Sequence, residues 1–244
     1  MNELHLFGKK ILIDKSPVLM SYHPDGNWRD FFTVMGGSWT QKDGWLIGTE
    51  SGNKGGILFT RESYDVNVMM RFRVQTVLPA ERDLNAVFCA HWDESTDYLG
   101  ESYVCGLNGW YEHKSGIERN GISNLHASTT LYHYRPGEEV EMLCGAVNGH
   151  CFMVVDGVLV SELIDPQPLI GGHVGFFHLD GGHELLRAGL LHARTATAAH
   201  HIIIQPVEIL ARELLAVTGH TFRIVLAHVV FLVGIVVADP LLLH

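Results

Sequence analysis

The segment 83–119 gathers side chains whose types could carry out chemistry. It opens with a strand-like run, 83–91, and continues into a stretch dense in aromatic, acidic and basic residues. The members of that stretch are Trp92, Asp93, Glu94, Asp97, Tyr98, Tyr103, Trp110, Tyr111, Glu112, His113, Lys114 and Glu118. A sugar needs such a mixture, because it has apolar ring faces and a rim of hydroxyl groups. The segment therefore favours a carbohydrate site, and the alternative is an ordinary surface loop of a β protein.

Alternation along the run 83–91 predicts one core face and one polar face. The core face carries Leu84, Ala86, Phe88 and Ala90, and the other face carries Asn85, Val87, Cys89 and His91. Aromatic residues in or beside the following loops would supply a stacking platform, since exposed rings need a reason to be exposed. The residues expected to bind substrate are Asn85, Trp92, Tyr103, Trp110, Tyr111 and His113.

Three side chains are candidates for catalysis: Asp93, Glu118 and His91. Glycoside hydrolysis requires two carboxyl groups, about 5–5.5 Å apart in a retaining enzyme and farther apart in an inverting one. Asp93 and Glu118 would have to converge in space to meet that requirement. Solvated loop acids are the alternative interpretation of both.

The sequence predicts no metal site and no cofactor. Cys89 and His91 could bind one metal ion together, but no second Cys/His pair lies nearby, so a zinc site is not expected. The acidic loop 93–97 could hold Ca²⁺, which prefers clustered oxygen ligands, although a solvated loop is the favoured interpretation. The four cysteines, which are Cys89, Cys105, Cys144 and Cys151, are interpreted as buried free thiols.

Short strands separated by tight turns surround this segment. The dipeptides Asp43-Gly44, Asn148-Gly149 and Asp156-Gly157 separate apolar runs and predict hairpins, because both central residues of a type I′ turn need positive φ. The run 66–74 alternates strictly, as a half-buried strand does. About ten short strands and no convincing helix before residue 180 predict an all-β, two-sheet antiparallel β-sandwich or jelly roll.

The order of these elements resembles the concanavalin A-like lectin/glucanase superfamily, and is most similar to bacterial sugar-associated domains of unknown function and 3-keto-disaccharide hydrolase-type domains. The resemblance covers about residues 35–178. It is carried by Trp39, Asp43-Gly44, Leu46 and Gly48, by 57–60, by 71–73, by the two later turns and by 172–176. It implies two curved sheets with a glycan bound on the concave face or at its edge loops. Fold alone does not establish a function.

Two enzymatic patterns of this class are absent or incomplete. The glucanases of this fold carry their acids as E-x-D-x-x-E on one strand, and no such motif occurs here. Jelly-roll polysaccharide lyases use Tyr and His to move protons, and Tyr111-Glu112-His113-Lys114 resembles a lyase motif with one residue too many between Tyr and Lys. Asn85, Tyr103 and Arg119 would complete a lyase site.

The last part of the chain departs from the resemblance. Residues 181–244 lack Lys, Asn, Ser, Tyr, Trp, Cys and Met but hold seven of the 16 histidines. We therefore expect a sandwich over 1–180 and an atypical, apolar and His-rich tail over 181–244, with a helix at 208–217. Run 224–238 is apolar but shorter than the roughly 20 residues of a membrane span. Three interpretations of the tail stay open. It is foreign to the fold, it packs on the sandwich as a helix or strand, or it anchors the chain at a membrane.

The charge and composition of the chain limit the classes of partner that it can bind. The net charge is −10, and no basic stripe is present, so a nucleic-acid partner is not expected. A membrane partner is also disfavoured, and the N-terminus has no secretory signal, so the expected compartment is the cytoplasm. The expected partner is an oligosaccharide or other sugar, and the sequence gives no indication of oligomeric state. Three functions stay open: glycan binding, sugar processing by a hydrolase or lyase, and a non-catalytic structural module.

Overall fold

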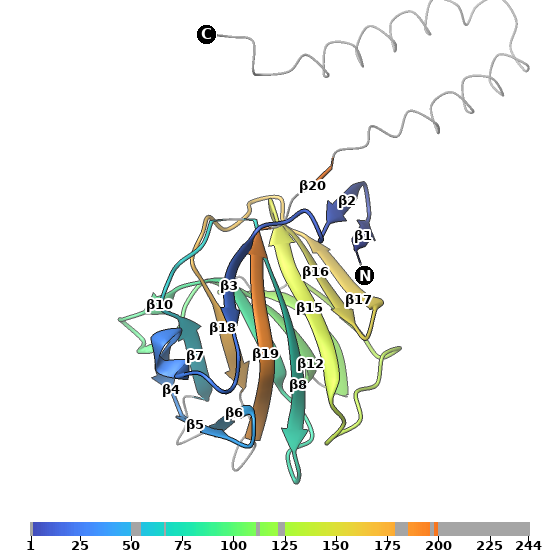
Figure 1. Ribbon diagram of the computed structural model, residues 1–244. Coiled ribbons are helices and arrows are strands. Elements are labelled where there is room, and N and C mark those ends of the chain that lie inside the picture. Colours follow the sequence, from blue (N-terminus) through green and yellow to red (C-terminus); the bar gives the residue numbers. More distant parts are fainter. Residues whose placement is uncertain are drawn as a thin grey trace, which may run out of the picture. The chain divides into compact units, whose positions relative to one another are not determined.

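A computed structural model describes residues 2–49, 55–65, 67–110, 113–121, 125–178, 185–195 and 198–199, the last two ranges by their backbone. Within these residues the chain is almost entirely β-strand and includes one short 3-10 helix, η1 (Trp28–Asp30). Two large antiparallel sheets lie face to face (Figure 1). The predicted all-β sandwich is confirmed.

The first large sheet has seven strands and carries the segment of interest. In spatial order its strands are β14 (His126–Thr129), β13 (Lys114–Asn120), β12 (Ser102–Trp110), β9 (Leu84–Ala90), β18 (His173–His178), β7 (Gly56–Thr60) and β4 (Phe32–Gly36). Because β9 is its central strand, β12 and β18 border β9 on either side.

The second large sheet has eight strands, seven in one path and one joined to its side. The path is β17 (Val158–Ile164), β16 (His150–Val155), β15 (Val140–Val147), β8 (Val68–Val77), β19 (Leu185–Thr195), β6 (Trp45–Thr49) and β5 (Ser38–Lys42), and β3 (Val18–Tyr22) pairs with β19. Figure 1 shows this sheet in front, with β19 between β3 and β8.

The three predicted tight turns are confirmed. They join β5 to β6, β15 to β16 and β16 to β17, and in each turn both central residues have φ between 48° and 82°. Asp, Asn and Gly tolerate this left-handed conformation best, which is why these dipeptides are strong hairpin signals.

The main core lies between the two large sheets. Phe72 of β8 and Phe176 of β18 meet edge to face with ring centroids 5.1 Å apart. Val68, Met70 and Val74 alternate inward along β8 with Phe72, as the period-two pattern predicts.

Each sheet also has a smaller apolar cluster on its outer face. The hairpin of β1 (Glu3–Leu6) and β2 (Lys9–Leu12), which β20 (Ala198–Ala199) extends, covers part of the eight-stranded sheet. The hairpin of β10 (Trp92–Asp93) and β11 (Tyr98–Leu99) contributes Leu99 to the cluster outside the seven-stranded sheet.

Strand β19 carries the sandwich past the boundary at residue 180 that the sequence suggests. It pairs with β8, β6 and β3, so the sheet is closed by a strand that pairs near the N-terminus. The predicted helix at 208–217 and the apolar run 224–238 lie outside the described residues. Among the described residues, no helix has the length and apolar character to cross a membrane.

Candidate functional site

Asn85 lies on the outer face of the seven-stranded sheet. Its neighbours along β9, Ala86 and Phe88, point into the core between the sheets, and Val87 belongs to the outer cluster. In the register of the sheet, Asn85 stands between Gly106 of β12 and Phe177 of β18. Alternation on a central strand therefore places an amide beside the apolar cluster on the outer face.

The alternation predicted for this strand ends at a bulge. Cys89 has φ of 48° and packs in the core between the sheets, and Ala90 turns to the outer cluster instead. The pairing with β18 shifts register at the same point. The predicted faces of Cys89 and Ala90 are therefore wrong, because one extra residue in a strand reverses the orientation of those that follow. His91 is exposed, and its Nδ1 lies 3.1 Å from the carbonyl oxygen of Cys89.

A pocket of about 240 Å³ opens on this face. Its lining residues are Arg82, Asp83, Asn85, Val104, Gly109, Trp110, Glu118 and Phe177. Of the residues expected from the sequence, Asn85, Trp110 and Glu118 meet here, from β9, β12 and β13. His91 does not line this pocket.

Trp110 and Glu118 form one wall of the pocket. The indole Nε1–H donates a hydrogen bond of 2.8 Å to Glu118 Oε2. An irregularity in the pairing of β12 with β13 precedes Trp110, where Asn108 has φ of 53°. The Asn108 side chain donates to the carbonyl oxygens of Glu81 and Tyr134, at 3.2 and 3.1 Å. These bonds hold the bulge that sets the position of the indole.

The Asn85 amide is fixed in a defined orientation. Its Nδ2 donates to Asp83 Oδ1 at 3.4 Å. Because a carboxylate can only accept, the amide nitrogen of Asn85 must face Asp83, and the amide oxygen Oδ1 of Asn85 faces away from it. Asn85 is 4% exposed, and its Oδ1 accepts no hydrogen bond from any described residue. A Cβ at Gly106 would collide with this oxygen, and one at Gly109 would lie 3.0 Å from it. Two glycines thus make room for a buried acceptor, and burying a polar atom without a partner is costly.

Asp93 does not join Glu118. Its Oδ1 accepts from the backbone N–H and hydroxyl of Ser95, at 2.9 and 2.6 Å, and its Oδ2 accepts from the Thr96 hydroxyl at 2.9 Å. These bonds lower the pKa of Asp93 and use both oxygens within its own turn. Asp93 does not line the pocket, where Asp83 is the second carboxylate beside Glu118, and the catalytic roles of Asp93 and Glu118 stay predictions.

Tyr103 faces the interior instead of the sugar-binding surface. Its hydroxyl donates to Asp165 Oδ2 at 2.8 Å and accepts from the Leu169 backbone N–H at 3.0 Å. Burial raises the pKa of this phenol. Arg119 joins the same network, with Nη1 2.7 Å from Asp165 Oδ2. Tyr103 is 1% exposed and does not line the pocket, so its predicted contact with substrate has no support in this geometry.

Two other predicted binding residues, Trp92 and His113, do not line the pocket. Trp92 packs edge to face on Phe59, with ring centroids 6.4 Å apart, and so helps to cover the outer apolar cluster. His113 is exposed and has φ of 54°. Tyr111 lies outside the described residues.

Metal ligands do not cluster in the described part of the chain, where no three His, Cys, Asp or Glu side chains come together. In the loop 93–97 the Asp93 carboxylate accepts hydrogen bonds from Ser95 and Thr96, and binding of Ca²⁺ there stays a prediction. The four cysteines are buried free thiols, as the sequence predicts.

Three kinds of residue that line the pocket are not predicted from the sequence. Asp83 stands two positions before Asn85, so period-two alternation could have found it. Val104 and Phe177 form the apolar floor, and only the register between strands brings them beside β9. Arg82 and Gly109 carry no signal in the sequence.

Comparison with known proteins bears on the fold. No family model matches the sequence, and no curated protein matches it. A galectin-like protein of unknown function from Bacillus subtilis is 12% identical, with a TM-score of 0.56 over 75% of this chain and 99% of that one. An endo-β-1,3-glucanase from Pyrococcus furiosus is 11% identical, with a TM-score of 0.53 over 82% and 100%. Basic winged bean lectin with Tn-antigen is 13% identical, with a TM-score of 0.51 over 73% and 98%. These likenesses show the fold alone, and the predicted two-sheet jelly roll is confirmed.

Proposed function

We propose that the pocket at Asn85, Trp110 and Glu118 binds a carbohydrate. One observation carries this proposal: Trp110, Glu118 and Asn85, whose buried amide oxygen has no described partner, line the same cavity on the outer face of a sheet. The indole offers an apolar plane to a sugar ring, and the two oxygens accept hydrogen bonds from hydroxyl groups. A glucanase and a lectin share the fold, which supports the proposal without deciding it.

The pocket is sized for a single sugar unit. Its volume of about 240 Å³ lies below the range of about 300–1,000 Å³ that is typical of pockets for drug-sized ligands. Val104 and Phe177 give it an apolar floor, while the polar atoms stand at its sides. One ring of an oligosaccharide would enter, and the rest of the glycan would extend over the sheet.

Calorimetric titration with neutral oligosaccharides tests the proposal. We expect binding in the millimolar range or tighter, and Trp110→Ala should weaken it about tenfold or more, since a central Trp often dominates an interface. Trp45→Ala is the matched control, because Trp45 is a half-buried indole on the other sheet. If no oligosaccharide binds at millimolar concentration, or if both variants bind as the wild type does, the proposal is wrong.

Glycoside hydrolysis is the second candidate, and one observation favours it. Two carboxylates, Asp83 and Glu118, line the pocket, and a pair of carboxyl groups is the minimum that such an enzyme needs. Release of reducing ends from a bound oligosaccharide would be the assay. Glu118→Gln and Asp83→Asn should each abolish release while binding stays measurable. A protein that binds the oligosaccharide and never cleaves it is a binding module.

A further inference from the structure

A second pocket lies away from the carbohydrate pocket and has no lining residue in common with it. It has a volume of about 580 Å³ and is formed by two segments, one around η1 and the other along β5 and its turn. The lining residues are Pro24, Asn27, Trp28, Arg29, Trp39, Thr40, Gln41, Lys42, Asp43 and Gly44. This volume falls within the range of about 300–1,000 Å³ that is usual for small-molecule sites.

The walls of the pocket are built into the core. Trp28 and Trp39 are 3% and 4% exposed and belong to the main cluster between the sheets. The Trp39 indole N–H donates to the Gly36 carbonyl oxygen at 3.1 Å. Gln41 Nε2 donates to the carbonyl oxygen of Pro24, which ties the two segments together. The pocket is therefore preformed, as small-molecule sites usually are.

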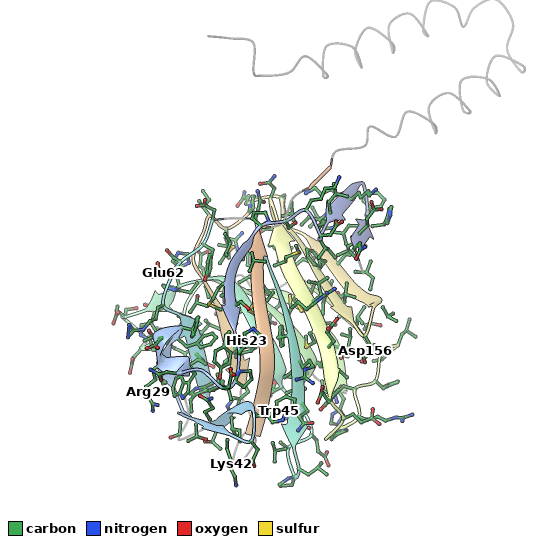
Figure 2. The ribbon with its side chains drawn as sticks, in the orientation of Figure 1. His23, Arg29, Lys42, Trp45, Glu62 and Asp156 are labelled. Carbon is green, nitrogen blue, oxygen red and sulfur yellow. The ribbon has the colours of Figure 1, made fainter. Side chains whose placement is uncertain are left out.

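Two cationic side chains line this pocket without a described anionic partner. Arg29 and Lys42 are exposed, and neither forms a salt bridge with a described carboxylate. The guanidinium of Arg29 lies 4.3 Å from the centroid of the Trp28 ring, an arrangement that holds it in place. Figure 2 shows Arg29 and Lys42 on the same side of the protein.

Two acids stand beside the lining residues in the sequence. Asp25 follows Pro24 and Asp30 follows Arg29, but neither lines the pocket, and Asp30 Oδ1 accepts from Asn27 Nδ2 at 2.9 Å. Asp43 is the acid among the lining residues, and it sits in the tight turn with φ of 52°. The lining residues thus carry two cations and one anion, on a chain whose net charge is −10. An excess of cations in the lining attracts anionic ligands to this pocket more than to the rest of the acidic surface.

We propose that this second pocket binds a small organic anion through Arg29 and Lys42. The recognised group is an oxyanion, that is a carboxylate, a sulfate ester or a phosphate ester, because Arg and Lys give charge-assisted hydrogen bonds to such oxygens. The body of the ligand occupies the rest of the cavity between the two segments. This site is independent of the carbohydrate proposed for the other sheet.

Four probes that share one ring test the proposal: glucose, glucuronate, glucose 6-sulfate and glucose 6-phosphate. Two-dimensional NMR titration of the full chain should show shifts at Arg29, Lys42 and the Trp39 indole with at least one anionic probe and not with glucose. The double variant Arg29→Gln, Lys42→Gln should weaken that binding about tenfold or more, since hydrogen bonds to charged groups are the strong ones. Raising the salt concentration should weaken it too, because the site is exposed.

Two controls keep the outcome interpretable. Arg135→Gln removes an exposed cation elsewhere, which forms an ion pair with its near neighbour Glu138, and should leave binding unchanged. Trp110→Ala, in the carbohydrate pocket, should also leave it unchanged, so the two proposals fail separately. Asp43→Asn should strengthen binding by removing the one acid. Equal shifts with glucose, no shift with any anion, or full binding by the folded double variant would overturn the proposal.

Discussion

The Trp110 indole donates its N–H to Glu118 Oε2 at 2.8 Å, so the aromatic plane and the carboxylate of the pocket are positioned together. Glu118→Gln keeps an acceptor for the indole but removes the charge. We expect it to weaken carbohydrate binding by about 1 kcal/mol, because hydrogen bonds to charged groups exceed neutral ones by about that amount. Glu118→Ala should weaken binding further, since the indole also loses its partner. Calorimetry on both variants distinguishes the two effects, and a tighter-binding Glu118→Ala would contradict this account.

Gly106 provides the space that the Asn85 oxygen occupies. In Gly106→Ala the new Cβ would collide with Oδ1, and it would also lie 3.4 Å from Trp110 Cη2. The amide must move, so we expect carbohydrate affinity to fall about tenfold or more through the loss of a positioned acceptor. Gly26→Ala is the control, because its Cβ would meet only the His23 carbonyl oxygen, at 3.4 Å. Equal affinity of Gly106→Ala and the wild type would mean that Asn85 takes no part.

Tyr103 serves stability and not binding. In Tyr103→Phe the Leu169 N–H loses its acceptor and Asp165 loses a donor, both in the interior. We expect the free energy of unfolding to fall by about 1–3 kcal/mol, the usual cost of unsatisfied buried groups. Urea denaturation measures this loss, and carbohydrate affinity of the folded variant should be unchanged. A variant of normal stability that no longer binds would reverse the assignment.

Burial raises the pKa of the Cys89 thiol from 9.0 to about 11. The unfolded chain therefore loses this proton at lower pH than the folded chain does. The stability that the buried thiol contributes is fully present below pH 9 and is lost as the pH rises through about 11. Two pKa units correspond to about 3 kcal/mol at about 1.4 kcal/mol per unit. Cys89→Ala should remove this part of the alkaline destabilisation, as urea melts at pH 8 and 10.5 would show. Parallel pH profiles for both proteins would contradict the burial argument.

Local signals predict much of the fold. Asp43-Gly44, Asn148-Gly149 and Asp156-Gly157 adopt the positive φ that their types allow, and the hairpins follow. Strict alternation places Met70 and Phe72 correctly in the core. Strand β19 lacks such a signal, because its pairing shifts register between Ala188 and Leu191 and the alternation restarts there.

Local signals also predict part of the pocket lining. Asn85 follows from alternation, and Trp110 and Glu118 follow from residue type. The sequence does not predict that Cys89 faces the core or that His91 does not line the pocket, because a bulge at φ of 48° is invisible in the residue types around it. Tyr103 and Asp93 do not line it either, and their hydrogen-bond partners, Asp165 in one case and Ser95 in the other, belong to structure that alternation does not describe.

The central claim is that a sugar ring enters the pocket at Asn85. Its most direct measurement is a ¹H–¹⁵N NMR titration that follows the Trp110 indole N–H and the Asn85 side-chain amide during addition of an oligosaccharide. We expect both signals to move together and to saturate at one concentration, while the Trp45 indole stays in place. Saturable binding that moves the Trp45 indole and leaves Asn85 and Trp110 unshifted would contradict the claim.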